Sequence, residues 1–388
     1  MNNSWTRTSL GDICMFRAGT AFPKEFQGDV SGEIPFIKVS DLKHSANSLY
    51  IRHSANWVDM STVKHLKASL LYPGAIVFAK IGEGLKAERF RLVARPTCID
   101  NNLMGAIPQG VNTHFLYYLM VHTGVAHLVE GSALPYLRQS DLERIPVCVP
   151  PNDDQRRIAE VLGALDDKIE SNRRITVKCD EIASELFGQA ASVNRKLDEV
   201  SEVRMGVSPP GFSYNETGEG IAFFQGVRDF SYLHPVARVY TNEPKRLATP
   251  GDILFSVRAP VGRLNIADVP CCIGRGLAAI TSNRSAICLF ALRAAAAEWE
   301  KFSAEGTVFG AVNQKSLKSA LIPWPDPLAE EELEYQLNSL VALVSQSERE
   351  SISLSKLRDT LLPELMSGRM QVDEAGRLVS DALNEEAF

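Results

Sequence analysis

The chain contains an internal duplication, and this feature limits its possible fold more than any other. Residues 71–82 carry a Pro-Gly pair followed by a short apolar run, and residues 248–259 repeat that arrangement 177 positions later, from Gly74 to Gly251. Self-similarity at a fixed spacing is the signature of repeated structural units. We therefore predict two domains that share one fold.

The segments that flank this repeat correspond as well. Residues 10–19 and 197–206 each begin with a leucine, continue with an acidic and β-branched stretch and end in glycine. Downstream, Glu-Gly-Ser at 130–132 pairs with Glu-Gly-Thr at 305–307. Each copy is then followed by a long segment with a helical pattern. Two copies of a globular unit, each followed by a helix, suggest that the two halves of the chain perform the same kind of function.

Length and composition exclude several classes of protein. A chain of 388 residues can form two or three domains with separate cores. No apolar run reaches the roughly 18 residues of a membrane span, and the N-terminus lacks the apolar core of a signal peptide, so we expect a cytoplasmic protein without membrane contact. The seven cysteines include no Cys-x-x-Cys and no histidine partners at metal spacing, so we expect reduced thiols and no metal.

The charge of the chain is unevenly distributed. The total is −6, yet residues 1–150 carry a net charge of +3 and residues 197–325 a net charge of +1. Residues 326–388 carry −9. Both globular copies are therefore slightly basic, and the acidity belongs to the last helix and tail. Two interpretations of that acidity stay open: a solvated helix surface, or a surface that binds a basic partner.

Each copy has the pattern of a mixed α/β domain with a small sheet. Short apolar runs bounded by Gly, Pro, Asn and Asp predict strands, at 34–39 and 75–78 in the first copy and at 221–224 and 253–257 in the second. Helical patterns lie between them at 114–128 and 288–302. The predicted fold class is α/β (mixed α+β), with two similar domains.

Two long helices follow the two copies. The first pattern runs through 154–189 almost without proline or glycine, and both have apolar positions spaced by threes and fours. At 1.5 Å per residue each helix would be roughly 50–55 Å long. The apolar positions, called the helix seam below, are Leu162, Leu165, Ile169 and Leu186 in the first helix and Leu337, Leu340, Val344, Leu361 and Leu365 in the second.

The helix seam needs a partner, and the other long helix is the simplest one. A chain ordered domain, helix, domain, helix, with its helices antiparallel, would hold the two domains at opposite ends with a pseudo-two-fold relation. A bundle formed between chains is the alternative. The predicted boundaries are 1–150 and 193–327 for the two similar domains, 151–192 and 328–368 for the long helices, and 369–388 for an acidic tail.

Motifs for catalysis are missing from the sequence. It contains no phosphate-binding G-x-x-x-x-G-K-[ST], no H-E-x-x-H, no G-x-S-x-G and no G-x-G-x-x-G after a strand. Residues 208–212 and 224–228 resemble fragments of methyltransferase motifs, but each lacks a required residue and is interpreted as a turn. We therefore predict no catalytic residue, metal ligand or cofactor site in this chain.

Long planar and amide side chains instead gather in the predicted loops of both copies. Arg and Lys can bind guanine O6 and N7 or phosphate, and Asn and Gln can bind adenine N6 and N7, so these residues are suited to reading DNA. The candidates are Lys80, Arg89, Arg91, Asn101, Asn102, Tyr136, Arg138 and Gln139 in the first copy and Arg258, Arg263, Arg275, Asn313, Gln314 and Lys315 in the second.

Together these features resemble the specificity subunit of type I restriction-modification systems over nearly the whole chain. No single motif is diagnostic, but their doubled order is specific. The matching residues in the first half are Trp5, Leu10-Gly-Asp-Ile13, Ile34-Pro-Phe-Ile37, Pro73-Gly-Ala-Ile-Val-Phe78, Ile99-Asp100 with Asn102, residues 131–137, Ile145-Pro146, and Gln155 with Asp166; in the second half they are Pro250-Gly251 with Arg258, Asn313-Gln314, Ile322-Pro323, and Leu361-Leu-Pro363 with Gly368.

The resemblance implies two target recognition domains that read the halves of a split double-stranded DNA sequence. It also implies docking of two adenine-N6 methyltransferase subunits, with motor-nuclease subunits as further partners, and it leaves S-adenosylmethionine, ATP and Mg to those partners. Two departures stand out. The second helix begins with acidic residues at 328–334 instead of a glutamine-led pattern, and Gly274-Arg-Gly276 replaces the Asp-Asn-Asn stretch of the first copy.

Two other functions stay open at this stage. A stand-alone DNA-modifying enzyme would need its own acidic or nucleotide-binding site. A coiled-coil scaffold without DNA binding would use the long helices but not the polar loops. Turnover by the purified chain would identify the first, and the absence of salt-dependent duplex binding would identify the second.

Overall fold

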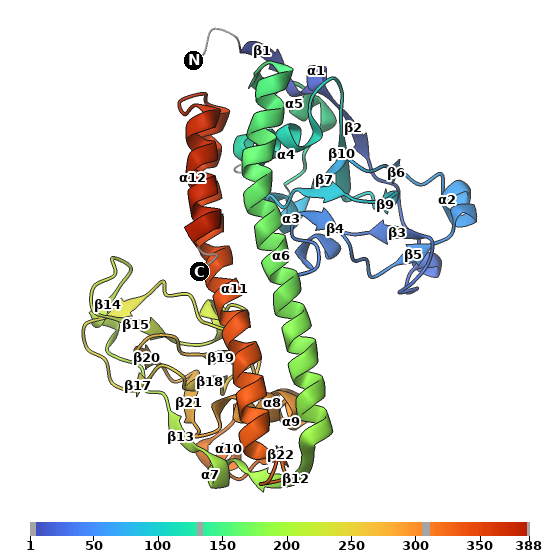
Figure 1. Ribbon diagram of the computed structural model, residues 1–388. Helices are drawn as coiled ribbons and strands as arrows, with labels where there is room; N and C mark the ends of the chain where they lie inside the picture. Colours follow the sequence, from blue (N-terminus) through green and yellow to red (C-terminus); the bar gives the residue numbers. More distant parts are fainter. Residues whose placement is uncertain (1–4, 130–134, 305–310, 386–388) are drawn as a thin grey trace. The chain divides into compact units, whose positions relative to one another are not determined.

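The computed structural model describes residues 5–129, 135–304 and 311–385, and the chain divides into two compact units (Figure 1). The first unit consists of Met1–Ser171 with Ile352–Phe388, and the second consists of Asn172–Ser351. The repeated segments at 130–132 and 305–307, and most of the 131–137 motif, lie outside the described residues.

Three small sheets form the β-structure of the first unit. Their strand orders are β2-β10-β7-β8-β4, β5-β3-β9-β6 and β1-β11. The strands are β1 (Thr6–Ser9), β2 (Cys14–Ala18), β3 (Ile34–Ile37), β4 (Tyr50–Ile51), β5 (Trp57–Val58), β6 (Leu70–Leu71), β7 (Ile76–Ala79), β8 (Arg91–Val93), β9 (Thr97–Ile99), β10 (Leu103–Pro108) and β11 (Pro146–Val149).

The second unit repeats this arrangement. Its sheets have the orders β13-β21-β18-β19, β14-β16-β15-β20-β17 and β12-β22. The strands are β12 (Ala191–Lys196), β13 (Glu202–Met205), β14 (Tyr214–Asn215), β15 (Ile221–Phe224), β16 (Tyr240–Thr241), β17 (Leu247–Ala248), β18 (Ile253–Ser256), β19 (Leu264–Ile266), β20 (Cys271–Ile273), β21 (Leu277–Thr281) and β22 (Leu321–Pro325).

One parallel strand pair in each unit identifies the correspondence most clearly. β3 and β9 run parallel, with Ile37 opposite Ile99, and β15 and β20 run parallel, with Phe224 opposite Ile273. All four strands are almost completely buried, which explains their continuous apolar sequences. The predicted duplication and mixed α/β class are confirmed, with three small sheets in each unit.

Short helices complete each unit around two long ones. In the first unit they are α1 (Leu10–Ile13), α2 (Met60–Leu66), α3 (Gly82–Lys86), α4 (Thr113–Thr123), α5 (Gln139–Glu143) and α12 (Val372–Glu385). In the second they are α7 (Leu197–Val200), α8 (Ser285–Ala294), α9 (Ala296–Ala304) and α10 (Gln314–Lys318). The long helices are α6 (Asn152–Ala190) and α11 (Glu330–Met366), and each contributes residues to both units.

Within the first unit, α6 and α11 pack as an antiparallel pair. Ile158 lines a small cavity with Leu365, whereas Asp166, further along α6, pairs with Arg358, earlier on α11. Leu162, Leu165, Leu361 and Leu365 are buried in the same core, and Ile169 packs against it partly buried.

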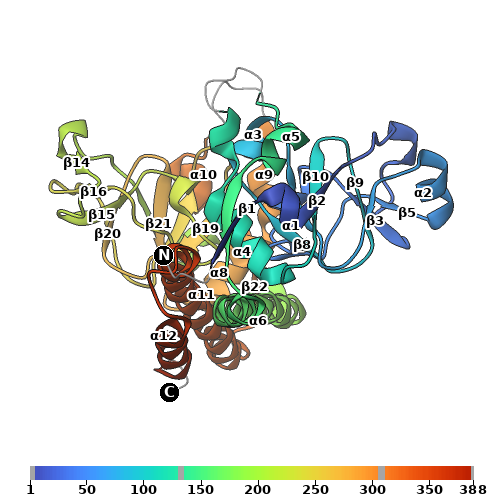
Figure 2. The same cartoon turned by 90° about the horizontal axis from the view of Figure 1, so that it is seen from above.

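The second unit holds the remaining parts of both helices, which are also antiparallel. Asn172 donates from Nδ2 to Oε2 of Glu350 at 2.8 Å, and Ala183 lines a small cavity with Leu340. The other seam residues, Leu186, Leu337, Leu340 and Val344, are buried or partly buried in its core. Figures 1 and 2 both draw the two helices side by side. The predicted pairing within one chain is therefore confirmed inside each unit.

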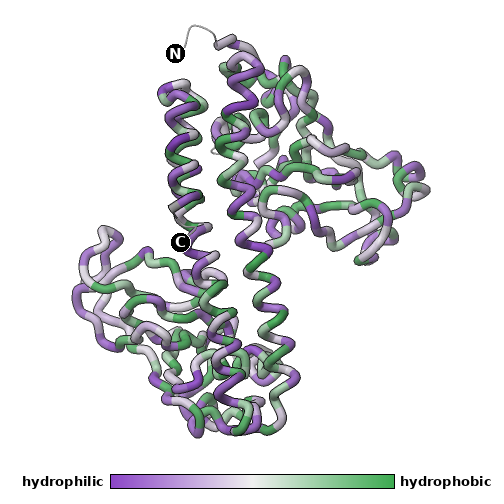
Figure 3. Tube along the Cα trace, in the orientation of Figure 1, coloured by the Kyte–Doolittle hydropathy of each residue, from purple (hydrophilic) through white to green (hydrophobic). Residues whose placement is uncertain are grey.

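The C-terminal segment contains a packed helix as well as acidic residues. α12 buries Ala375 and Val379 in the core of the first unit, and Asp373 forms an ion pair with Arg157 of α6. Hydrophilic and hydrophobic residues alternate along α6, α11 and α12, as expected for helices with one buried side (Figure 3). Within the described parts of the chain, no helix is long and apolar enough to cross a membrane.

Candidate nucleic-acid interface

In the first unit, the end of β7 joins two loops that carry candidate residues. The main-chain N–H of Lys80 donates to the carbonyl of Asn102 at 2.9 Å, and the N–H of Leu137 donates to the carbonyl of Lys80 at 2.9 Å. The Lys80 ammonium lies 5.8 Å from the centre of the Tyr136 ring, which is 54% exposed. Lys80, Asn102 and Tyr136 therefore form one cluster, which we call loop cluster 1.

The second unit builds the same frame from corresponding residues. The N–H of Val257 donates to the carbonyl of Gly276 at 3.0 Å, and the N–H of Val312 donates to the carbonyl of Val257 at 2.9 Å. Arg258 forms an isolated β-bridge with Ala311, as Ile81 does with Tyr136 in the first unit. We call Val257, Arg258, Gly276 and Val312 loop cluster 2. In this cluster Arg258 lies close to Ala311, in the segment that precedes α10.

A close main-chain approach beside each cluster requires glycine. A Cβ atom on Gly19 would lie 1.9 Å from the carbonyl oxygen of Asp100, and one on Gly206 would lie 2.1 Å from that of Gly274. Only a residue without a side chain fits at that distance. The glycine that ends both repeated segments, 10–19 and 197–206, therefore seats the turn that follows β9 or β20.

The turn after β9 carries two of the predicted residues. The buried carboxylate of Asp100 accepts from the N–H of Asn102 at 3.0 Å and from its amide nitrogen at 3.1 Å. Burial raises the pKa of Asp100, and these hydrogen bonds act against that shift. Asn101 is exposed at the tip of the turn. The Asp100 side chain therefore fixes the turn that presents Asn101 to solvent.

The turn after β20 presents Arg275 in the corresponding place. Its side chain is exposed, and its main-chain N–H donates to the hydroxyl of Ser208 at 3.2 Å. Ser208 in turn donates to Oε1 of Gln225 at 3.1 Å.

Two short helices place further candidates next to the clusters. Arg138 is the N-cap residue of α5, and Asn313 is the N-cap residue of α10, where its side chain accepts from the N–H of Ser316 at 2.9 Å. All the candidates at these helix starts are exposed: Arg138, Gln139, Asn313, Gln314 and Lys315. Gln139 bonds to Glu143 at 2.7 Å, and Gln314 makes a 3.4 Å bond to the carbonyl of Val203.

Three predicted arginines lie elsewhere. Arg91, on β8, donates to the main-chain carbonyls of Leu42, Asn47 and Phe90, and burial lowers its pKa. It lines a cavity of about 280 Å³ with Asp166 and other residues of the α4 and α6 region. Arg89 is half-buried two residues before it, and Arg263 is exposed in the turn between β18 and β19. The guanidinium of Arg91 thus holds the loop around residues 42–47.

Sequence reasoning missed Lys38, Ser208 and Gln225. Lys38 follows β3 directly and Gln225 follows β15 directly, so both stand at the ends of the parallel strands that support the two turns. A polar residue directly after a buried apolar strand is a usable signal, because loop positions at strand ends are exposed and held by a rigid scaffold.

A buried glutamate on α6 ties down a loop of the first unit. Glu170 accepts from the hydroxyl of Ser48 at 2.9 Å and pairs with Nε of Arg52 at 3.4 Å. These two residues flank β4, at the edge of the five-stranded sheet. Glu170 therefore links α6 to the edge strand β4 of this sheet.

A glutamate on α11 does the same in the second unit. Glu348, which is 178 positions after Glu170, accepts from three successive main-chain N–H groups at 2.9–3.3 Å, those of Tyr232, Leu233 and His234. His234 adds a 2.7 Å contact from its ring to the Ser345 hydroxyl. The loop is thereby fixed to α11.

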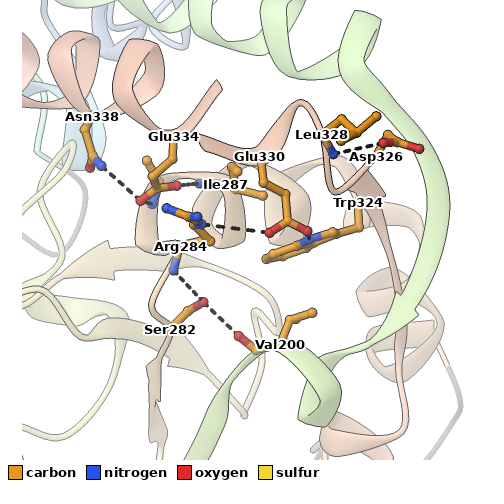
Figure 4. A network of polar contacts seen from close by, with 11 residues as sticks. Val200, Ser282, Arg284, Ile287, Trp324, Asp326, Leu328, Glu330, Glu334 and Asn338 are labelled. Carbon is orange, nitrogen blue, oxygen red and sulfur yellow. Dashed lines mark hydrogen bonds and ion pairs between the residues drawn. The ribbon is translucent and has the colours of Figure 1, made fainter. Parts of the chain in front are cut away.

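The start of α11 explains one departure between the two repeats. In the first unit, the side chain of Gln155 accepts from the N–H of Asn112, directly before α4. In the second, Glu334 accepts from the N–H groups of Ala286 at 3.1 Å and Ile287 at 2.9 Å, in the first turn of α8 (Figure 4). The carboxylate of Glu334 thus makes in the second unit the kind of contact that the amide of Gln155 makes in the first. Its negative charge is favourable at the N-terminus of α8, where the helix dipole is positive.

Neighbouring polar contacts hold Glu334 and the helix start in place. Asn338 donates to Glu334 at 2.9 Å, and Trp324 donates from its indole nitrogen to Glu330 at 2.9 Å (Figure 4). Arg284 lies 3.8 Å from the second oxygen of Glu330. Two acidic residues at the start of α11, Glu330 and Glu334, therefore already have hydrogen-bond partners within their own unit.

Neither a metal-binding cluster nor a disulfide is found among the residues that the structure describes. Among those residues no group of three or more His, Cys, Asp or Glu side chains is placed to bind a metal ion. All seven cysteines are free thiols, and six of them are buried.

Comparisons with known proteins agree on one family. The profile of the type I restriction modification DNA specificity domain matches residues 2–178 and 191–342. A protein of Methanocaldococcus jannaschii, provisionally assigned as the specificity subunit of the type I restriction enzyme MjaX, is 30% identical over 294 residues, which cover 68% of this chain and 69% of the relative. The MjaIX specificity subunit of the same organism is 25% identical over 200 residues, covering 50% of this chain and 45% of the relative.

Solved structures also match this chain. The S subunit of a type I restriction-modification system from M. genitalium matches with a TM-score of 0.62 at 16% sequence identity. The match covers 94% of this chain and 97% of that one.

Proposed function

The chain belongs to the family of type I restriction-modification DNA specificity proteins, and on that premise we propose that it is a non-catalytic subunit that reads both halves of a bipartite DNA target. Each unit would bind one half-site through its own loop cluster. Adenine methylation would be carried out by partner subunits, which bring S-adenosylmethionine.

The doubling of the loop clusters is the observation that carries this proposal. Corresponding positions bear exposed hydrogen-bonding side chains of different chemistry: Arg138 and Asn313 at the two N-caps, and Asn101 and Arg275 at the two turn tips. A shared scaffold with exchanged polar side chains is what two readers of different base sequences require, because base edges in the major groove differ in their donors and acceptors.

Affinity and discrimination would come from different residues. Lysine and arginine contacts to phosphate supply affinity that does not depend on sequence and weakens with salt. The net charges of +3 and +1 on residues 1–150 and 197–325 favour that attraction modestly. A few fixed side chains in each cluster would supply discrimination of about 1–3 kcal/mol for each good bidentate pair.

The paired helices α6 and α11 would set the gap between the half-sites. They have 39 and 37 residues, which corresponds to roughly 55–60 Å of helix each. Recognition by two readers on a stiff support makes half-site spacing a geometric property of the protein.

Two adenine-N6 methyltransferase subunits would dock on this chain, and motor-nuclease subunits that use ATP and Mg would join the assembly. The test is to express the chain with its neighbouring methyltransferase and to map N6-methyladenine in the DNA. We expect methylation within one split sequence, and none from either protein alone. Methylation by the purified chain alone would indicate a stand-alone enzyme, and an assembled complex without salt-dependent duplex binding would indicate a scaffold.

A further inference from the structure

In each unit, two adjacent parallel strands are each followed by a polar residue. Lys38 follows β3 and Asn101 lies after β9, while Gln225 follows β15 and Arg275 lies after β20. Asn101, Gln225 and Arg275 are exposed, and Lys38 is half-buried. The carboxyl ends of adjacent parallel strands are common ligand positions, because they place side chains on a rigid edge.

The second unit holds its pair through one hydroxyl group. Ser208 accepts from the main-chain N–H of Arg275 at 3.2 Å and donates to Oε1 of Gln225 at 3.1 Å. The bond to Oε1 orients the amide and leaves its nitrogen as the available donor. Among the residues that the structure describes, no hydrogen-bond partner is found for that nitrogen or for the Arg275 guanidinium.

The main chain next to Gln225 approaches the turn closely enough to require glycine at 276, and the Gln225 side chain crowds position 274. A Cβ atom on Gly274 would lie 2.6 Å from Oε1 of Gln225, and one on Gly276 would lie 2.3 Å from its carbonyl oxygen. The glycine at 276 in place of Asn102 is therefore explained by this close main-chain approach.

The first unit fixes its turn differently. Asp100 holds Asn102 by two hydrogen bonds and leaves Asn101 exposed at the tip. Lys38 donates from Nζ to Oε1 of Gln27 at 2.8 Å, so it is already held by a neighbour. Within the described part of the chain, the tip residue Asn101 again has no side-chain hydrogen-bond partner.

Building on the proposed function, we infer that the tip residues are base-reading residues: Arg275 binds a guanine in the half-site of the second unit, and Asn101 binds an adenine in that of the first. The planar fork of arginine matches guanine O6 and N7, and the amide of asparagine matches adenine N7 and N6. Gln225 adds a donor beside Arg275. The main chain of both turns is fixed, so the tip side chains leave it in a defined direction. Discrimination between bases requires such a direction, whereas contact with a phosphate does not.

The inference is tested in the complete complex with the methyltransferase, by sequencing methylated adenines in DNA that contains randomised half-sites. Arg275→Ala should make one guanine position of one half-site degenerate, with a loss of about 5- to 150-fold in preference for guanine there. Arg275→Lys should keep the charge but lose most of the same preference, because an ammonium group cannot form the bidentate pair. Asn101→Ala should relax one adenine position in the other half-site only.

Arg349→Ala is the matched control, because Arg349 is an exposed arginine on α11 in the same unit. It should leave both half-sites unchanged. Thermal unfolding should show that all four variants fold, since each replaced side chain is exposed.

Three results would overturn the inference. An unchanged target in Arg275→Ala would remove its role, and an equal loss on all sequences with weaker salt dependence would make it a phosphate contact. Full retention of the guanine preference in Arg275→Lys would exclude bidentate reading. A wild-type complex that methylates no defined split sequence would instead contradict the proposed function itself.

Discussion

Glu170 on α6 and Glu348 on α11 play corresponding roles in the two units, because each fixes a loop of its own unit by hydrogen bonds. Both are nearly buried, with 7% and 8% of their surface exposed. A buried carboxylate is stable only when its oxygens are satisfied, so the loop and the helix depend on each other. Each glutamate thus adds a polar anchor between a long helix and its unit, beside the apolar contacts of the core.

Glu348→Ala should lower the free energy of unfolding by about 2–4 kcal/mol, because it leaves up to three main-chain N–H groups without their charged acceptor. Urea unfolding of the purified chain measures this change. The control is Glu331→Ala, at an exposed position of the same helix, which should change stability by less than about 0.5 kcal/mol. Equal stability of the two variants would mean that the contacts of Glu348 contribute little.

The ion pair between Asp166 and Arg358 is a second test of the helix pairing. Asp166 is 5% exposed at its side chain, accepts from Arg358 at 2.6 Å and also from the Tyr118 hydroxyl at 2.6 Å. Removing one partner of a buried pair costs about 3–5 kcal/mol, and the 28% exposure of Arg358 reduces this, so we expect about 2–4 kcal/mol for Arg358→Ala.

The control for this pair is Asp166→Leu combined with Arg358→Met. This double variant removes both charges and should recover much of the loss, because an apolar pair avoids a lone buried charge. A double variant that is less stable than Arg358→Ala would instead indicate that the ion pair itself is strongly stabilising.

Buried thiols should make stability depend on alkaline pH. Burial raises the pKa of Cys98 and of Cys288 from 9.0 to about 12. The folded chain therefore binds these protons more tightly than the unfolded chain. Their contribution to stability is complete below pH 9 and is lost as the pH rises from 9 towards 12. Unfolding in urea at several pH values should show this decline, and Cys98→Ala should reduce its slope.

Thiol labelling of the native chain provides a separate check. Cys148 is the one half-buried cysteine, and the other six are buried. An alkylating reagent at pH 8, followed by peptide mass analysis, should modify Cys148 first and the others only after unfolding. Early modification of Cys98 or Cys288 would contradict their placement in the core.

The sequence predicts the periodic parts of this fold well. The duplication is visible as a repeated order of motifs, and the two helices are visible because apolar residues recur every three or four positions. Strand pairing is different: nothing local in residues 34–37 and 97–99 indicates that they run parallel and lie side by side. That contact joins segments about 60 residues apart, and only the packed core determines it.

The candidate site is less predictable, because exposure depends on distant partners. Arg91 and Arg275 look equally available in the sequence, yet main-chain carbonyls at residues 42 and 47 capture the guanidinium of Arg91. Lys38 and Gln225 were missed because the signal they carry, a polar residue directly after a buried strand, depends on knowing where the strand ends. The acidic end of the chain contains α12, whose buried face, with Ala375 and Val379, is hidden among charged residues in a segment of low mean hydropathy.

Lengthening both long helices tests the role of their pairing in DNA spacing. We expect that insertion of one heptad after Ser171 in α6, with a matching heptad after Ser351 in α11, preserves the helix seam because seven residues restore its period. Each helix becomes about 10 Å longer, which corresponds to roughly 3 base pairs of DNA. Methylation mapping should then find both half-sequences unchanged and the gap between them altered. The control is a heptad inserted into α6 alone, which mismatches the seam and should lower stability instead. An unchanged gap in the folded double insertion would show that the helices do not determine half-site spacing.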